Sequence, residues 1–160
     1  NTVHETILGF SDSYIEMLTV HLSGGEEMLK KAMLAAKTIR TKVIGVSILT
    51  SLNESDSLTV FNNNLNDQIV NLFKLAKKTN VDGIVCSPHE IEISNTILDP
   101  SSIKITPGIR EVEADDDQVR TMSAKDAIKK GANFLVIGRP ITEAKDISLA
   151  LKTFHDLTYE

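Results

Sequence analysis

The feature of this sequence that most constrains its fold is a regular alternation of short apolar runs with amphipathic helical patterns. Five apolar runs have the length and composition of buried strands, at 15–21, 43–49, 83–86, 103–106 and 134–137. A helical pattern follows each run, and this alternation predicts a parallel sheet covered by helices. Five strands fit either an open, doubly wound sheet or part of a barrel.

The segments between the strands carry capping and periodicity signals that predict their structure. We expect helices over 2–9, 26–38 and 67–78, a helix starting at Ser87-Pro88, one from Ser123 to Lys130 closed by Gly131, and a last helix starting at Thr142. Segment 51–66 is polar and is predicted to be irregular, although 58–61 could form a short ordered piece. Segment 111–121 is predicted to be an acidic loop.

Two of the predicted strands are followed by a glycine and then an arginine. Gly108 and Arg110 follow the fourth strand, and Gly138 and Arg139 follow the fifth. Glycine lets backbone N–H groups approach a ligand closely, and a guanidinium matches phosphate oxygens in a two-point fork. In (β/α)8 barrels the loops after the last two strands commonly build a phosphate site. The pattern therefore favours a barrel that binds phosphate, with an ordinary surface arginine as the alternative for Arg139.

Composition and charge exclude several other classes of protein. At 160 residues the length fits one domain, 1–160, and the net charge of −5 without a Lys/Arg run argues against a nucleic-acid partner. No apolar stretch approaches the length of a membrane span, and the single Cys86 suits a reducing cytoplasm. The four histidines lack metal-ligand spacing, and Asp115–Asp117 fits a solvated loop better than a cation site. We expect no metal, no nucleic acid and no membrane.

Seven motifs, in order along nearly the whole chain, resemble orotidine 5′-phosphate decarboxylase. They are the opening Asn1-Thr2, 20–25 with Met28, 49–51, 82–88 with Glu90, 106–110, Asp116-Asp117-Gln118-x-Arg120, and 131–141. The resemblance implies a (β/α)8 barrel that converts orotidine 5′-phosphate to UMP in de novo pyrimidine biosynthesis without metal or cofactor. The dinucleotide fingerprint and the Gly-x4-Gly-Lys-Ser/Thr phosphate loop are both absent from the sequence.

The resemblance also assigns roles to particular residues. It implies phosphate contacts from Arg139, the Gly138 backbone and Gln118, and it implies that Arg110 begins a loop that closes over the phosphate. Thr50 would touch the pyrimidine. The family is homodimeric, with active sites near the subunit interface, and Thr2 matches a residue that reaches the partner's substrate. On this basis we expect 111–121 to be a lid, with an ordinary flexible acidic loop as the alternative.

One departure from the family concerns the catalytic residues. The family motif Asp-x-Lys-x-x-Asp is followed by Ile-Pro-Asn-Thr, and this sequence opens with Asn1-Thr2. We therefore expect the motif and the first three strands to belong upstream of residue 1. They would be present as a separate, cleaved chain or in sequence that was not recorded. The third alternative is that the chain is a truncated product that pairs with something else. No catalytic residue is assigned in this chain, which is expected to be inactive alone as the C-terminal portion of a barrel. The alternatives are a non-catalytic phosphate-binding remnant or interaction module and, more distantly, a related barrel enzyme such as 3-hexulose-6-phosphate synthase.

Overall fold

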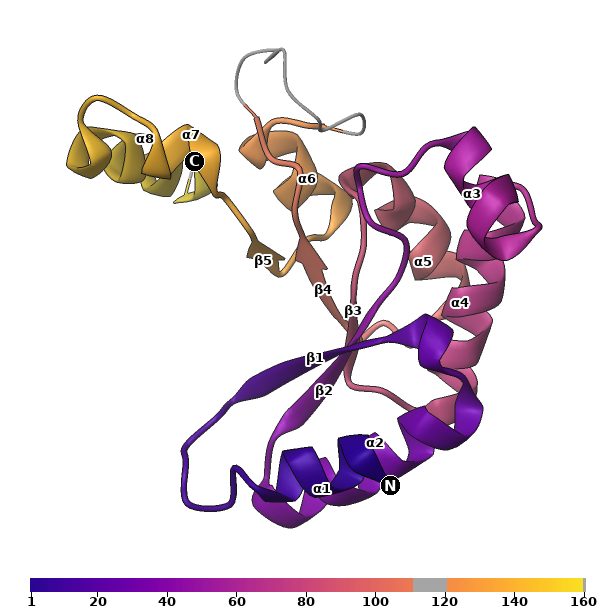
Figure 1. Ribbon diagram of the computed structural model, residues 1–160. Helices are drawn as coiled ribbons and strands as arrows, with labels where there is room; N and C mark the ends of the chain where they lie inside the picture. The colour runs from indigo at the N-terminus through magenta and orange to yellow at the C-terminus, as the bar shows by residue number, and fades with distance from the viewer. Residues whose placement is uncertain (111–120, 160) are drawn as a thin grey trace.

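The computed structural model describes residues 1–110 and 121–159, which form a five-stranded parallel sheet with helices on its outer side (Figure 1). The order of the strands in the sheet is their order in the chain, and each neighbouring pair is parallel. The strands are β1 (Met17–His21), β2 (Lys42–Val46), β3 (Gly83–Val85), β4 (Ile103–Thr106) and β5 (Phe134–Leu135). All five predicted strands are confirmed, most of them a few residues shorter than expected.

Helices connect the strands along the chain. They are α1 (Thr2–Leu8), α2 (Glu26–Ile39), α3 (Glu54–Phe61), α4 (Leu65–Thr79), α5 (Ile91–Ile97), α6 (Ala124–Lys130), α7 (Arg139–Thr142) and α8 (Ile147–Tyr159), with short 3₁₀ turns η1 (Leu22–Gly24) and η2 (Pro88–Glu90). Helix α6 begins and ends as its capping residues predict: the Ser123 side chain accepts a hydrogen bond from the Asp126 N–H, and Gly131 closes the helix at φ 110°. Within its described part, the chain contains no helix long and apolar enough to cross a membrane.

The ordered piece foreseen at 58–61 is part of a helix, but the prediction that the rest of 51–66 is irregular is wrong, because asparagine side chains there cap two helices. The Asn53 side chain accepts from the Asp56 N–H at 3.1 Å, and the Asp56 carboxylate accepts from the Asn53 N–H at 3.0 Å. This reciprocal pair starts α3, and Asn62 ends it in the left-handed conformation at φ 52°. The Asn64 side chain caps α4 by accepting from the Asp67 N–H at 2.8 Å, so that α4 starts two residues earlier than predicted.

The prediction that the last helix starts at Thr142 is also wrong, because two helices occupy this part of the chain. Helix α7 starts at Arg139, where Pro140 sits in the first turn and has no N–H to leave unpaired. It ends at Thr142, and α8 begins at Ile147. The Asp146 carboxylate accepts from the Leu149 N–H at 2.9 Å and so satisfies a donor in the first turn of α8.

The two faces of the sheet have different surroundings. Residues paired across the strands share a face, and alternate residues along a strand point to opposite faces. On the outer face Val43 and Ile84 are fully buried and belong to the same hydrophobic core as Phe73 of α4. On the inner face Val46, Val85, Ile105 and Phe134 are paired in one row across β2 to β5. Phe134 is 46% exposed, and Val136, two residues further along the chain, is 50% exposed. In the described sheet β1 and β5 each pair with one neighbour, and the inner face is exposed mainly toward β5, since Ile44 on the same face is fully buried.

Candidate functional site

The candidate site lies at the carboxyl ends of the strands. Because the strands are parallel and paired in register, their carboxyl ends meet along the same edge of the sheet. In α/β folds ligands bind at this edge, where the loops after the strands converge. Gly108, Arg110, Gly138 and Arg139 all follow the ends of β4 and β5.

The two arginines occupy matched positions in the segments that follow two neighbouring strands. Thr106 and Leu135 are partners in the register of β4 and β5. Arg110 lies four residues after Thr106, and Arg139 lies four residues after Leu135. The structure therefore brings both arginines to one end of one strand pair, as the sequence predicts. Guanidinium groups are the side chains that match the oxygens of an anionic group such as phosphate in a two-point fork.

The backbone at each arginine has features that favour close approach of a ligand. Gly108 is buried and adopts φ 78°, a left-handed conformation that favours glycine. The Arg110 guanidinium donates to the carbonyl of Ile109 at 2.9 Å. Gly138 is exposed and immediately precedes α7, which the half-buried Arg139 opens. No atom of the described residues lies within 4 Å of where a Cβ would stand on Gly138, so those residues leave the backbone at this position open to a ligand.

The remaining candidate residues lie elsewhere. Thr50 follows β2 at the same edge and is 8% exposed, but β3 and β4 separate its strand from β5. Thr2 opens α1, which packs against α2 at the β1 side of the sheet, opposite the β5 side. The structure therefore does not bring Thr2 together with the arginines. Gln118 and most of the predicted lid lie outside the described residues.

Sequence reasoning missed one contact at this end of the sheet. His89 follows β3, and its Nε2 atom lies 2.9 Å from the carbonyl oxygen of Thr121, which returns from the segment after β4. The two residues are 32 positions apart in the chain. The sequence places His89 four residues after Val85 and so at the carboxyl end of β3, but it carries no signal that pairs His89 with Thr121.

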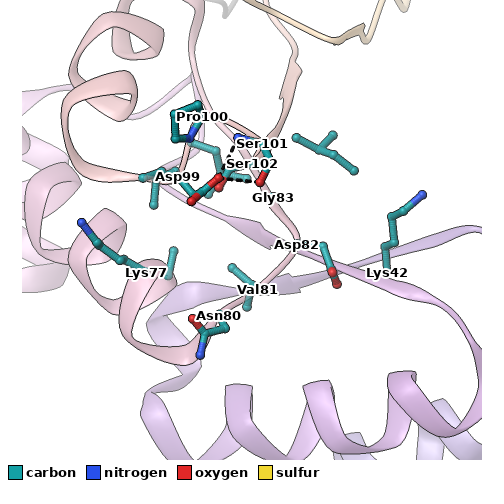
Figure 2. Close-up of a pocket in the computed structure, with 14 residues that line it drawn as sticks. Lys42, Lys77, Asn80, Val81, Asp82, Gly83, Asp99, Pro100, Ser101 and Ser102 are labelled. Atoms are coloured by element: carbon teal, nitrogen blue, oxygen red, sulfur yellow. Dashed lines mark hydrogen bonds between the residues drawn. The ribbon is translucent and has the colours of Figure 1, made fainter.

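A cavity of about 630 Å³ lies at the opposite end of the sheet, among the amino ends of β2, β3 and β4 (Figure 2). Asp82 lines it and accepts from the Val43 N–H at 2.7 Å, and Asp99 accepts from the backbone and hydroxyl of Ser101. These Ser101 hydrogen bonds, helped by the positive charge of Lys77, hold the pKa of the Asp99 carboxyl below its ordinary value. Both carboxylates thus fix the turns that lead into the strands.

The described residues also bear on metal binding. Among them, no three His, Cys, Asp or Glu side chains gather closely enough to hold a metal ion. Asp115–Asp117, which the sequence placed in a solvated loop, lie outside the described residues.

Comparison with known proteins places these features in a family. A family model described as "Orotidine 5′-phosphate decarboxylase / HUMPS family" matches residues 1–154. An orotidine 5′-phosphate decarboxylase of Wolbachia pipientis subsp. Culex pipiens is 42% identical over 161 residues, covering 98% of this chain and 71% of the relative. One from Ehrlichia chaffeensis is also 42% identical, over 91% of this chain and 64% of the relative.

Solved structures agree with the fold. The orotidine 5′-phosphate decarboxylase of Lactobacillus acidophilus superposes with a TM-score of 0.82 at 29% identity, over the whole of this chain and 70% of that one. The enzyme of Pyrococcus horikoshii superposes with a TM-score of 0.72 at 20% identity, which speaks for the fold alone. The predicted fold class is confirmed: the chain supplies five strand–helix units of a (β/α)8 barrel.

Proposed function

The chain belongs to the orotidine 5′-phosphate decarboxylase / HUMPS family, and on that premise we propose that it takes part in converting orotidine 5′-phosphate to UMP. Its own part is to hold the 5′-phosphate at the carboxyl ends of β4 and β5. The observation that carries this proposal is the matched placement of Arg110 and Arg139, four residues beyond a register pair. This is the position at which barrels of this class commonly bind phosphate.

The proposed phosphate site uses side chains and backbone together. Arg139 offers a two-point fork to the phosphate oxygens, and the open backbone at Gly138 lets an oxygen approach the start of α7. Arg110 and Gln118 supply further donors, and Thr50 at the end of β2 contacts the pyrimidine. Binding energy from the phosphate, remote from the reacting carbon, then helps to orient the ring for decarboxylation.

The chemistry itself requires a group that this sequence does not contain. Loss of CO2 leaves a carbanion at C6, which a positioned ammonium must stabilise and protonate. No Asp-x-Lys-x-x-Asp occurs in these 160 residues, so we assign no catalytic residue here. We propose that this motif and the strands that cover the open inner face belong to a segment completing the barrel, in the same polypeptide or a second one. Neither metal nor cofactor has a role in this proposal.

The family resemblance adds assembly and location to the proposal. We propose a cytoplasmic homodimer in which Thr2, at the start of α1, approaches the partner's substrate. A two-fold interface repeats each such contact twice. Sedimentation of the complete, active protein tests this, and a monomer at micromolar concentration would contradict it.

A second function of a different class is supported by the exposed apolar side chains on the inner face, Phe134 and Val136. The chain would then be a phosphate-binding or interaction module without activity. Measuring UMP formation by the complete gene product separates the two: metal-independent turnover supports the enzyme, and phosphate binding without turnover supports the module.

The phosphate site is tested by comparing two ligands. In the complete gene product, Arg139→Ala should weaken UMP binding by about 2–4 kcal/mol, the range for removing one partner of a buried charge pair. Uridine, which lacks the phosphate, should bind the variant and the parent alike. Lys129→Ala, at an exposed cation of α6, is the control and should change neither. Equal losses for UMP and uridine in Arg139→Ala would mean that Arg139 is structural.

A further inference from the structure

The segment that follows β4 leaves and re-enters the described structure through a closed neck. The Arg110 N–H donates to the Met122 carbonyl at 2.9 Å, and the Met122 N–H donates to the Gly108 carbonyl at 3.1 Å. Ile109 and Met122 are paired as an isolated parallel bridge between these bonds. We call Gly108–Arg110 together with Thr121-Met122 the neck. Arg110 is part of it, so the position of this phosphate-site residue depends on how the neck is held.

A side chain from η2, the turn that follows the neighbouring strand β3, holds the neck from outside. His89 Nε2 lies 2.9 Å from the Thr121 carbonyl oxygen. A carbonyl can only accept, so Nε2 carries the proton and donates it. Thr121 directly precedes Met122, whose two backbone bonds reach Arg110 and Gly108. His89 is therefore connected to Arg110 in three steps: its hydrogen bond to Thr121, the peptide bond from Thr121 to Met122, and the backbone hydrogen bond between Met122 and Arg110.

The base from which His89 reaches the neck is itself buried and fixed. Ser87 and Glu90 are 0% and 4% exposed. The Ser87 hydroxyl accepts from the His89 N–H at 3.3 Å, and the Glu90 carboxylate accepts from the Ser87 N–H at 3.3 Å, which together start η2. A donor on such a base holds its acceptor better than one on a mobile loop, because less conformational freedom is lost when the bond forms.

We propose that His89 is a positioning residue of the phosphate site, which fixes Arg110 by clamping Thr121 to the end of β3. The inference rests on the proposed function, because it concerns how that site is ordered for a nucleotide phosphate. His89 need not touch the ligand. Its effect passes through the neck, and it should alter binding of the phosphate while leaving binding of the base and ribose unchanged.

Two amide substitutions of different reach test this in the complete gene product. His89→Gln keeps an N–H donor near the position of Nε2, whereas His89→Asn keeps the amide but is too short to reach Thr121. We expect His89→Asn to raise the Kd for UMP about fivefold, the effect of losing one ordinary hydrogen bond, and to leave the Kd for uridine unchanged. KM for orotidine 5′-phosphate should rise similarly while kcat changes little. His89→Gln should restore both within about twofold.

Hydrogen exchange gives a readout that does not depend on activity. Without ligand, the amides of Arg110 and Met122 should exchange faster in His89→Asn than in the parent and in His89→Gln. Glu92→Gln is the matched control, because the Glu92–Lys130 ion pair at 2.6 Å also joins the α5 and α6 units but bypasses the neck. It should change neither exchange at these two amides nor the preference for UMP over uridine.

The outcomes separate this inference from the proposed function. If the unsubstituted protein binds UMP no better than uridine, the proposed phosphate site is wrong. If it prefers UMP and His89→Asn keeps that preference and normal exchange, His89 is a surface histidine without a positioning role. Equal loss in His89→Asn and His89→Gln would likewise overturn the proposal, because a donor of the right reach would then be irrelevant.

Discussion

The outer and inner faces of the sheet are built from the same strands but have different surroundings. On the outer face Val43 and Ile84 are fully buried under the helices of this chain. On the inner face Phe134 and Val136 are about half exposed, although they are as apolar. Strands with apolar residues on both faces are typical of sheets that are covered on both sides. The chain therefore packs the helical layer of a barrel by itself. The inner face beside Phe134, near the end of the sheet that carries Arg110 and Arg139, remains to be covered by a further segment or partner.

The largest expected effect concerns activity, which depends on the uncovered face. The 160-residue chain alone should form UMP from orotidine 5′-phosphate at background rate, at least about 10²–10⁴-fold below the complete barrel, because no Asp-x-Lys-x-x-Asp motif is present in these residues to supply the proton-donating ammonium. The measurement is UMP formation with and without a segment that completes the barrel. Metal-independent turnover by the chain alone, well above background, would show that the inner face already forms a working site.

The next largest effect concerns the covered face. Phe73 of α4 is fully buried in the outer core, and Phe73→Ala should lower the free energy of unfolding by about 3–5 kcal/mol through lost burial and the cavity left behind. Denaturant titration of the chain alone measures this. A loss below about 1 kcal/mol would mean that the outer layer is not the packed core that its burial indicates.

Phe134→Ala is the counterpart on the inner face, with a smaller expected effect. In the chain alone its side chain is 46% exposed, so the loss in unfolding free energy should stay below about 1.5 kcal/mol, less than for a fully buried large side chain. In a completed barrel the same change should cost more, because the ring would be covered. Equal cost in the two contexts would mean that the added segment does not cover this face.

The smallest effect is electrostatic and lies on the outer layer. Hydrogen bonds from Lys30 and then Lys78, at 2.7 and 2.6 Å, hold the pKa of the Glu26 carboxyl below its ordinary value of 4.5. A carboxyl group whose pKa is lowered in the folded state stabilises that state. The stabilisation is complete at pH values above the ordinary pKa and is lost as the pH falls through the lowered pKa. The exposed site makes the effect slight.

The test for Glu26 compares the melting temperature at pH 7 and below pH 4. At pH 7 the Tm of Glu26→Gln should be lower than that of the parent. Below pH 4 the difference in Tm between the variant and the parent should be smaller. Glu27→Gln is the control, since Glu27 is 85% exposed and contacts Lys30 only at 3.6 Å. A Tm difference between the parent and Glu26→Gln that is the same at both pH values would rule out the ionic contribution.

The strand–helix order could be predicted from sequence because the spacing of apolar residues and the capping and turn residues between elements are local properties of the chain. The two errors arose where side chains decide the structure. Asn53 and Asn64 are polar and suggested a loop, but their side-chain oxygens cap α3 and α4. At 139–147 the helical pattern hid a break between α7 and α8. Local hydrogen bonds of this kind can favour either a turn or a helix start, so composition alone does not decide between them.

The candidate site was predictable only in part. The Gly-Arg endings located Arg110 and Arg139 at one end of one strand pair, because the ends of neighbouring parallel strands must meet. The His89–Thr121 contact joins residues 32 positions apart and depends on how two loops pack, which no local pattern encodes. Gln118 was proposed from resemblance alone and lies outside the described residues, so its role stays a prediction.

The agreement between strand order in the sheet and strand order in the chain has a consequence for biosynthesis. As the ribosome releases the chain, each strand from β2 to β5 finds its partner already made, one helical crossover earlier. No strand in the described sheet has to wait for a distant one. The described sheet can thus grow by adding each strand beside the one made just before it, so that each pairing closes only the loop of a single crossover and loses less chain entropy than a pairing with a more distant strand would.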